Sequence, residues 1–526
     1  MCGIVGYTGP QSASIPLIEG LRRLEYRGYD SAGIALGTPG KLFIEKKAGK
    51  LSNLENALDA SLPNVHSGIG HTRWATHGGP TDTNAHPHVD NDEKLAVIHN
   101  GIIENYTELR AQLEAKGHKF SSETDTESVA HLLSDLRKEH KGDLTAAMRD
   151  AVKALRGSFT LLAIHADQPD VVVGVRRNSP LVVGVGKGEN FMASDVAAFI
   201  EYTKHAIELG QDEIVTMTPT SVEVTDLDGK AVKAKEYEIS WDASAAQKGG
   251  FAHFMLKEIF EQPKAVADTL IGRLSDNNQI LLDELHMSHD EIRSLKKITV
   301  IACGTAYHAG MVAKYAIEKW AKIPVEVEIA SEFRYRDPII DPSTLIIAIS
   351  QSGETMDTLM AVRHAKAAGG RVLAICNTNS STIPRESDAV LYTHAGPEIA
   401  VASTKALLTQ MIAVYLIGLH LGQVNGSLKD TEVRDLYKEL LELPGKIEQI
   451  LETVEPLRAL TRTFAENNTV LFLGRNIGYP VALEGALKLK ELAYIHAEGF
   501  AGGELKHGPI ALIDKGTPVI AILPAG

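Results

Sequence analysis

The sequence predicts an α+β first half followed by an α/β second half with parallel sheets. Three observations support this: residues 1–240 mix short strands with helices, residues beyond about 250 alternate nearly continuous apolar strands with helices, and the second half repeats itself. The 526-residue length leaves room for two to four domains. A hydrophobic fraction of 44% and a charged fraction of 23% are ordinary for a folded chain.

The first domain is expected to span residues 1–240. Within it, residues 94–103 (KLAVIHNGII) predict a strand, and residues 105–117 predict a helix that ends at a glycine. The small, polar stretch WDASAAQKGG follows. We therefore assign residues 241–285 to a linker and a connecting helix.

The strands of the second half are apolar along their whole length. Residues 297–304, 344–350 and 372–376 have the composition of parallel strands buried on both faces. The stretch 406–424 contains no Asp, Glu, Lys or Arg and is long enough to cross a membrane. It also contains Thr409, Gln410, His420 and Gln423, so we expect a buried helix and no membrane partner.

The second half contains two copies of one strand–loop–helix unit. Three stretches of the first copy align in register with the second: 299–318 with 469–488, 331–334 with 503–506, and 344–353 with 517–526. This predicts one domain at 286–435 and a second at 455–526. The first copy continues with further strands and an apolar helix, so roughly 75–80 residues are missing from the second. We expect the chain to be cut short there, with an unpaired sheet edge.

Charge and cysteine content limit the class of partner and the compartment. A net charge of −14 argues against nucleic acid or an acidic membrane surface as a partner. The three cysteines, Cys2, Cys303 and Cys376, imply no disulfide framework. A reducing, cytoplasmic location is expected.

Cys2 is a candidate nucleophile. If Met1 is removed, one residue carries a thiol and a free α-amino group, which titrate near 8.5 and 7.7–8.0. A nucleophile and a base would then occupy the same residue. The alternative is that Cys2 is only a small residue at the start of a strand.

Further polar residues suit an amide substrate. Asn100 and Gly101, which we expect at a turn, could donate hydrogen bonds to an oxyanion. Arg73 offers a fork for a carboxylate, and Asp125 could hold an ammonium group. Taken singly, Asn-Gly is a common turn and Asp125 can be a helix cap. Together with Cys2 they describe a glutamine amidohydrolase site.

The first-half motifs CGIVG (2–6), YRGYDSAG (26–33), HTRWATHG (71–78), NAHPH (84–88) and HNG (99–101) resemble the glutaminase domain of N-terminal-nucleophile amidotransferases. The resemblance implies a four-layer α/β/β/α sandwich. It makes Cys2 the nucleophile and Asn100 with Gly101 the oxyanion hole. It also implies glutamine-binding roles for Arg73, Thr76, His77 and Asp125, and an ammonia gate at Trp74.

Three loops of the second half suit a phosphate. SQSGET (350–355) lies between a buried strand and a helix that begins near Met356, where hydroxyls and backbone N–H groups can bind an anion. CGTAYHAG (303–310) and VASTKA (401–406) repeat the arrangement. The alternative is that these Ser and Thr residues are helix caps. Dispersed, neutral loops suit a sugar phosphate better than a nucleotide, and no metal-ligand spacing is present.

SQSGET resembles the phosphosugar loop of sugar isomerase domains. The domain order, with LEGALKLKE (483–491) and GGELKHGP (502–509), is similar to the glutamine–fructose-6-phosphate aminotransferases. That family converts fructose 6-phosphate and glutamine into glucosamine 6-phosphate and glutamate, the first step of amino-sugar synthesis. The resemblance implies a homodimer without a cofactor.

The same resemblance assigns roles in the sugar site. Glu491 would shuttle a proton between C1 and C2, His507 from the neighbouring subunit would assist ring opening, and Lys488 would lie in the site. The residues implied to bind the sugar phosphate are Gly304, Thr305, Ser350, Gln351, Ser352, Thr355, Val401, Ala402 and Ser403. Read without the resemblance, LEGALKLKE could be an exposed helix with i,i+4 ion pairs.

Two features depart from the family pattern. Ala306 stands where the family usually has a serine, and the family's C-terminal catalytic lysine has no counterpart before Gly526. A phosphoribosyl-type amidotransferase and a noncatalytic sugar-phosphate sensor remain as alternatives. The doubled isomerase unit disfavours the first, and the Cys2 site disfavours the second.

Overall fold

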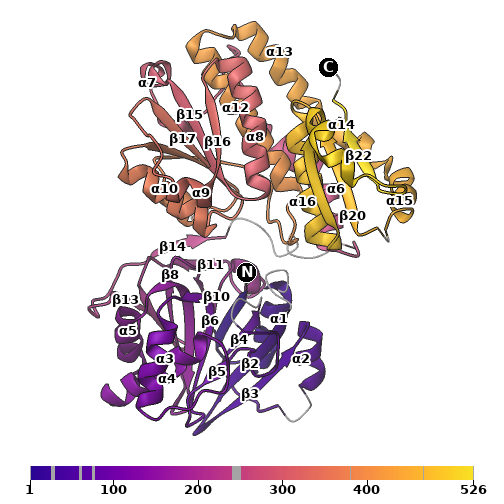
Figure 1. Cartoon of the computed structure of the whole chain (residues 1–526). Coiled ribbons are helices and arrows are strands. Elements are labelled where there is room, and N and C mark those ends of the chain that lie inside the picture. Colours follow the sequence, from indigo (N-terminus) through magenta and orange to yellow (C-terminus); the bar gives the residue numbers. More distant parts are fainter. Residues whose placement is uncertain are drawn as a thin grey trace. The chain divides into compact units, whose positions relative to one another are not determined.

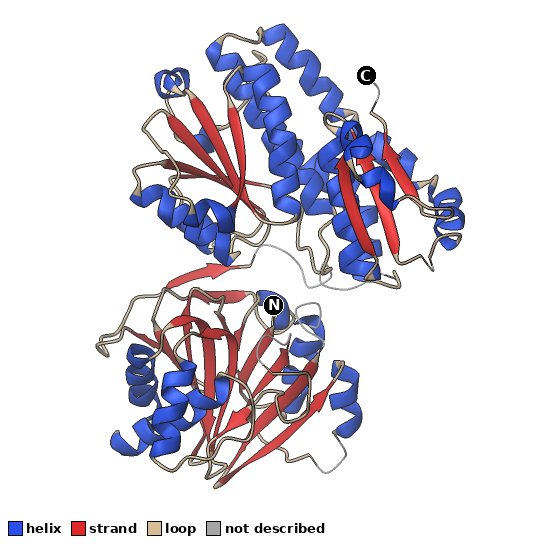
Figure 2. Cartoon of the chain, in the orientation of Figure 1, coloured by secondary structure: helices blue, strands red, loops and turns tan. Residues whose placement is uncertain are grey.

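The computed structural model describes residues 2–24, 30–58, 62–73, 78–239, 250–379, 381–465 and 467–524. The chain divides into two compact units, Met1–Gln247 and Lys248–Gly526, each described by itself below. Figures 1 and 2 show the helices and strands of both units.

The first unit contains two antiparallel sheets. An eight-stranded sheet has the order β14-β11-β9-β10-β1-β4-β2-β3, and a six-stranded sheet has the order β13-β12-β8-β7-β6-β5. The strands are β1 (Gly3–Thr8), β2 (Ser31–Thr38), β3 (Lys41–Ala48), β4 (Ser67–Arg73), β5 (His88–Val89), β6 (Leu95–Ile103), β7 (Gly157–His165), β8 (Gln168–Arg177), β9 (Val182–Val185), β10 (Asn190–Ala193), β11 (His205–Glu208), β12 (Ile214–Met217), β13 (Val222–Thr225) and β14 (Lys235–Glu238).

In the described part of this unit, five α-helices cover the outer faces of these sheets: α1 (Ser14–Leu24), α2 (Leu51–Ala57), α3 (Tyr106–Ala115), α4 (Thr126–Glu139) and α5 (Leu144–Ala154). Alternation along β1 separates the layers, since Ile4 packs between the sheets whereas Val5 packs toward α1. Along β6, Ala96 faces the other sheet and Val97 faces α4 and α5. These packing layers confirm the expected α/β/β/α sandwich (Figure 2).

The second unit contains two parallel sheets. The five-stranded sheet has the order β16-β15-β17-β18-β19, and three strands follow the order β21-β20-β22. Their bounds are β15 (Lys297–Ala302), β16 (Val325–Ile329), β17 (Thr344–Ser350), β18 (Arg371–Cys376), β19 (Ala389–Tyr392), β20 (Thr469–Gly474), β21 (His496–Ala501) and β22 (Val519–Ile522). The three central strands of the first copy, β15, β17 and β18, are almost fully buried, as parallel strands covered on both faces must be.

The helices of this unit are α6 (Phe254–Leu270), α7 (His289–Ser294), α8 (Thr305–Ala321), α9 (Ala330–Tyr335), α10 (Met356–Ala367), α11 (Thr382–Glu386), α12 (Lys405–Asn425), α13 (Asp430–Leu441), α14 (Leu443–Leu451), α15 (Val454–Arg462) and α16 (Gly478–Ala493). The pairs β15–α8 and β20–α16 fall where the internal repeat predicts them. Both copies also place their second strand on one side of the first and their third strand on the other.

Helix α12 is long and apolar enough to cross a membrane, and among the described residues it alone meets that test. It is a core helix in this unit, as its sequence predicts, because Ile412, Leu416 and Leu419 are fully or almost fully buried in the largest hydrophobic cluster. The polar side chains Thr409 and Gln410 are buried with them.

Candidate functional sites

Asn100 and Cys2 meet at the start of the first unit. Asn100 Nδ2 donates to the carbonyl oxygen of Cys2 at 2.9 Å. Cys2 is half-buried, directly before β1. A side-chain amide has two N–H donors, so one donor of Asn100 remains for a second acceptor beside Cys2.

The structure corrects the expectation that Asn100 and Gly101 form a turn. Both lie inside β6, where Asn100 pairs with Thr160 and Gly101 with Phe159 of β7. Gly101 has φ 119°, and a Cβ there would lie 2.0 Å from the carbonyl oxygen of Ser158. Only glycine fits at this positive φ next to the backbone of β7, so Gly101 lets the strand continue past Asn100.

Arg73 ends β4 with its side chain buried. Its guanidinium donates to the carbonyl oxygens of Gly78 and Gly79, each at 3.3 Å. Burial lowers the pKa of Arg73, whereas the negative charges of Cys2 and Asp125 oppose this shift. Arg73 therefore lies within electrostatic range of both. Trp74, Thr76 and His77 lie outside the described residues.

Asp125 stands directly before α4 but does not act as the helix cap that its position suggests. Its side chain makes no capping hydrogen bond to α4. Instead, Oδ2 accepts from the backbone N–H of Ile103 at 2.9 Å and lies 3.8 Å from Nδ1 of His99. The carboxylate is thereby joined to β6, the strand that carries Asn100 and Gly101.

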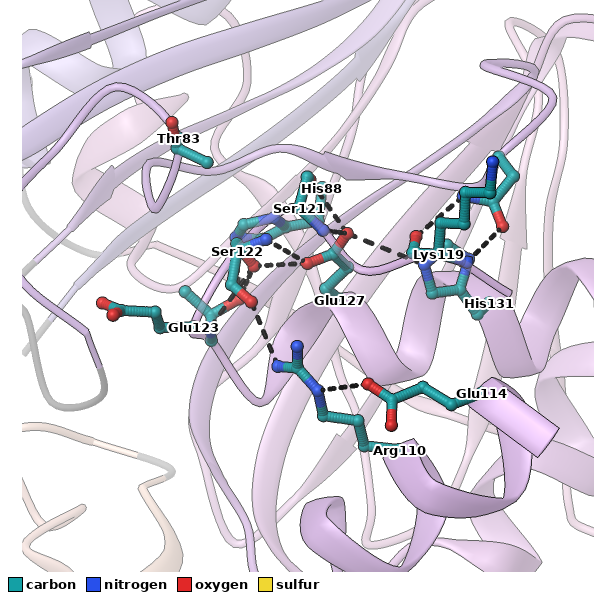
Figure 3. A network of polar contacts seen from close by, with 12 residues as sticks. Thr83, His88, Arg110, Glu114, Lys119, Ser121, Ser122, Glu123, Glu127 and His131 are labelled. Atoms are coloured by element: carbon teal, nitrogen blue, oxygen red, sulfur yellow. Dashed lines mark hydrogen bonds and ion pairs between the residues drawn. The ribbon is translucent and has the colours of Figure 1, made fainter. Parts of the chain in front are cut away.

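A polar network holds the segment that leads into Asp125 (Figure 3). The Glu127 carboxylate accepts from the backbone N–H and hydroxyl of Ser121, at 2.7 and 2.9 Å, and from the same groups of Ser122, both at 2.6 Å. Burial alone would raise the pKa of Glu127, but His131 and these hydrogen bonds lower it well below its ordinary value. A charged Glu127 thus fixes the loop that presents Asp125.

The predicted phosphate loops of the second unit follow adjacent strands. Since β15 and β17 pair in parallel, the loops at Gly304 and Ser350 share the carboxyl edge of the sheet, where open α/β sheets bind ligands. Ser350 Oγ accepts from Gly353 N at 3.1 Å and lies 3.1 Å from Thr355 Oγ1. Thr355 makes no side-chain cap to α10, which disfavours the helix-cap alternative.

The third loop differs from the other two. The carboxylate of Glu398 occupies the N-terminus of α12, where Oε1 accepts from the backbone N–H groups of Thr404 at 2.8 Å and Ala406 at 3.1 Å. Ser403 Oγ donates to the other carboxylate oxygen at 2.8 Å. A phosphate at this helix end would face a carboxylate of the chain itself. Val401, by contrast, is exposed.

Thr305, at the start of α8, contacts the second copy of the repeat. Its hydroxyl donates to Glu484 Oε1 of α16 at 2.9 Å and accepts from Lys488 Nζ at 3.0 Å. His308 Nδ1 lies 2.6 Å from Glu484 Oε2. Lys488 also pairs with Glu491 at 2.5 Å. LEGALKLKE is therefore not simply an exposed helix, because Glu484 is only 7% exposed.

Sequence reasoning missed Glu484 and His308. The Glu484–Lys488 spacing of one helical turn was a visible signal, but the partner on α8 depends on how the two copies pack. His507 lies in an exposed turn, Gly502–His507, and in the part of the chain described here it bonds to neither Lys488 nor Glu491.

Comparison with known proteins identifies both units. The glutamine amidotransferase domain family matches residues 71–201, and the SIS domain family matches 291–419 and 463–526. A glutamine–fructose-6-phosphate aminotransferase (isomerizing) from Streptomyces coelicolor is 62% identical over all of this chain and 85% of its own length. A relative of the same name from Corynebacterium efficiens is 58% identical over all of this chain and 86% of its own length.

A solved structure resembles the second unit. It is the C-terminal domain of glucosamine-fructose-6-phosphate aminotransferase from Francisella tularensis, which is 44% identical with a TM-score of 0.52. The similarity covers 53% of this chain and 78% of that one.

Proposed function

The chain belongs to the family of isomerizing glutamine–fructose-6-phosphate aminotransferases, and on that premise we propose that it makes glucosamine 6-phosphate and glutamate from fructose 6-phosphate and glutamine. The observation that best supports the glutaminase step is the 2.9 Å hydrogen bond from Asn100 Nδ2 to the Cys2 carbonyl oxygen. It brings an amide donor to the residue that bears the thiol.

In the glutaminase step, the Cys2 thiol attacks the side-chain amide carbon of glutamine. Its proton passes by way of the Cys2 α-amino group, freed when Met1 is removed, to the departing ammonia. The oxyanion accepts from Asn100 Nδ2 and the Gly101 N–H. Water then cleaves the thioester to give glutamate and restores the thiol.

Glutamine is oriented by charge. Arg73 binds its α-carboxylate and Asp125 binds its α-ammonium group, which the proximity of Arg73 to both Cys2 and Asp125 supports. Thr76 and His77 line the pocket and Trp74 gates the exit of ammonia, as the family resemblance implies.

In the synthase step, the loops beginning at Gly304 and Ser350 bind the phosphate. The donors are Gln351, Ser352, Thr355 and the backbone N–H of Thr305, because the Thr305 hydroxyl already donates to Glu484. The loop 401–403 contacts the sugar, and Lys488 lies beside it. Glu491 moves a proton between C1 and C2, and His507 from a second subunit assists ring opening. We propose a cytoplasmic homodimer that acts on these two small substrates, without nucleic acid, a membrane or a cofactor as partner.

The test is glutamine hydrolysis by the purified chain and by Cys2→Ala. The variant should lose hydrolysis completely, while Cys303→Ala serves as a matched thiol control. Burial raises the pKa of Cys303, so its thiol is a poor nucleophile. Hydrolysis within tenfold of wild type in Cys2→Ala would refute the assignment. A wild-type chain that binds fructose 6-phosphate but never hydrolyses glutamine would indicate the sensor alternative.

A further inference from the structure

His71 is a buried residue of β4 that the proposed reaction does not use. Its side chain is fully buried, two residues before Arg73. Nε2 lies 2.9 Å from the carbonyl oxygen of His99 and 2.9 Å from Oδ1 of Asn100. Nδ1 of His86 lies 3.2 Å from the same nitrogen.

The hydrogen-bond partners fix the tautomer of His71. The backbone carbonyl oxygen of His99 can only accept, so Nε2 carries the proton, and the Asn100 side-chain atom that faces the same proton at 2.9 Å must be the amide oxygen. Nδ1 is then a bare acceptor, and it has no hydrogen-bond partner among the described residues. Burial lowers the pKa of His71 to about 3, which keeps the ring neutral at working pH.

The orientation of the Asn100 amide matters for catalysis. Its two ends have nearly the same shape, so their hydrogen-bond partners decide which end faces Cys2. With Oδ1 held by His71, Nδ2 faces Cys2. A flipped amide would direct its oxygen at the developing oxyanion and repel it.

We propose that His71 is a positioning residue for glutamine hydrolysis, which holds the Asn100 amide with its N–H donors toward the oxyanion. This inference rests on the proposed glutaminase function. The oxyanion exists only after attack, so a misoriented Asn100 lowers kcat and leaves the KM for glutamine nearly unchanged.

The experiment is a double-mutant cycle on the full chain with glutaminase kinetics as readout. His71→Phe removes the donor and should lower kcat about tenfold to a hundredfold, below the 10²–10³-fold loss typical of deleting an oxyanion donor. Asn100→Ala should itself lower kcat. In the Asn100→Ala background, His71→Phe should cost less than threefold more, because no amide remains to be oriented.

Two further variants separate positioning from folding. His71→Gln supplies an amide N–H and should recover part of the kcat lost in His71→Phe. His165→Phe is the matched control, since His165 is also buried, lies in β7 and accepts from the backbone N–H of Asp167 at 3.0 Å. It should leave kcat within twofold of wild type.

The outcomes separate the two hypotheses. The positioning role would be overturned if His71→Phe lowered kcat equally in the wild-type and Asn100→Ala backgrounds, or if it raised KM and left kcat unchanged. Neither result would contradict the role of Cys2 as the nucleophile. If His71→Phe does not fold, a folded His71→Gln whose kcat is no higher than that of Asn100→Ala would overturn it too. A wild-type chain without glutaminase activity would overturn both proposals.

Discussion

Thr305 and Glu484 lie 179 residues apart, and a 2.9 Å hydrogen bond joins them across the two copies of the repeat. The same carboxylate contacts His308 and Lys488. Glu484, together with the direct contact between Lys488 and Thr305, thus joins the predicted phosphate loop at Gly304 to the Lys488–Glu491 face of α16. Glu484 is buried, and a buried charge is costly unless it is paired and hydrogen-bonded.

Replacing Glu484 should weaken this junction. Glu484→Ala leaves His308 and Lys488 without their shared anion, and removing one partner of a buried ion pair costs about 3–5 kcal/mol of stability. Glu484→Gln keeps a hydrogen-bond acceptor and should cost less. Urea unfolding measures the loss of stability in each variant, and calorimetric titration with fructose 6-phosphate measures whether the variant still binds the sugar phosphate.

Glu442→Gln is the matched control for Glu484. Glu442 forms an exposed i,i+4 pair with Lys446, and such exposed pairs contribute little to stability. If Glu484→Ala were as mild as this control, the Glu484 contacts would not hold the two copies together. Glutamine hydrolysis should be unaffected by either change.

Features that depend on residues close together in the sequence could be predicted from it, whereas contacts between distant residues could not. The strand before SQSGET and the helix from Met356 were predictable because periodicity and loop chemistry are local. The repeat was predictable because its segments stay in register. Asn100 and Gly101 were misassigned to a turn because Asn-Gly usually forms one, whereas a neighbouring strand decides here. The Glu484 contacts depend on packing and left no sequence signal beyond Lys488.

The SQSGET loop can be tested at Ser352. We expect Ser352→Ala to weaken fructose 6-phosphate binding by about 0.5–1.5 kcal/mol, or up to about 3 kcal/mol if the hydroxyl bonds to a charged phosphate. The reverse change at the first loop, Ala306→Ser, should tighten binding or leave it unchanged. An unchanged Kd for Ser352→Ala would place the phosphate elsewhere, and weaker binding by Ala306→Ser would mean that the loop departs from the family arrangement.

Acid should destabilise the first unit through its buried histidines. Burial lowers the pKa of His71 to about 3 and lowers the pKa values of His86 and His88 well below the ordinary range. The unfolded chain therefore binds more protons below about pH 6.5, and stability falls as pH falls from there toward 3. His71 alone should contribute a loss of about 2 kcal/mol at pH 5.

Urea unfolding at pH 7.5, 6 and 5 measures this effect, with hydrogen exchange in β4 and β6 assigning the transition to the first unit. His71→Gln cannot take up that proton, so its loss of stability between pH 7.5 and 5 should be smaller by about 2 kcal/mol. The same pH dependence in the variant and the wild type would mean that His71 is not a buried neutral group.

Glu258 should give the opposite pH dependence in the second unit. This residue of α6 is 2% exposed, and its carboxylate accepts from the backbone N–H groups of Ile399 at 2.5 Å and Ala400 at 3.0 Å. Burial raises its pKa to about 7, although those hydrogen bonds oppose the shift. The folded chain then holds the extra proton between about pH 4.5 and 7, so the stabilisation present below 4.5 is lost as pH rises through 7.

That loss should total about 3 kcal/mol, at 1.36 kcal/mol per pKa unit. Glu258→Gln keeps an acceptor oxygen for Ile399 and Ala400 but cannot ionise. The free energy of unfolding of this unit should therefore no longer fall between pH 5 and 8. Glu258→Ala leaves both N–H groups unpaired and should lose about 1–3 kcal/mol for each. Hydrogen exchange at Ile399 and Ala400 reports the contact directly. Unchanged protection of both amides in Glu258→Ala would show that α6 does not hold the loop before Val401.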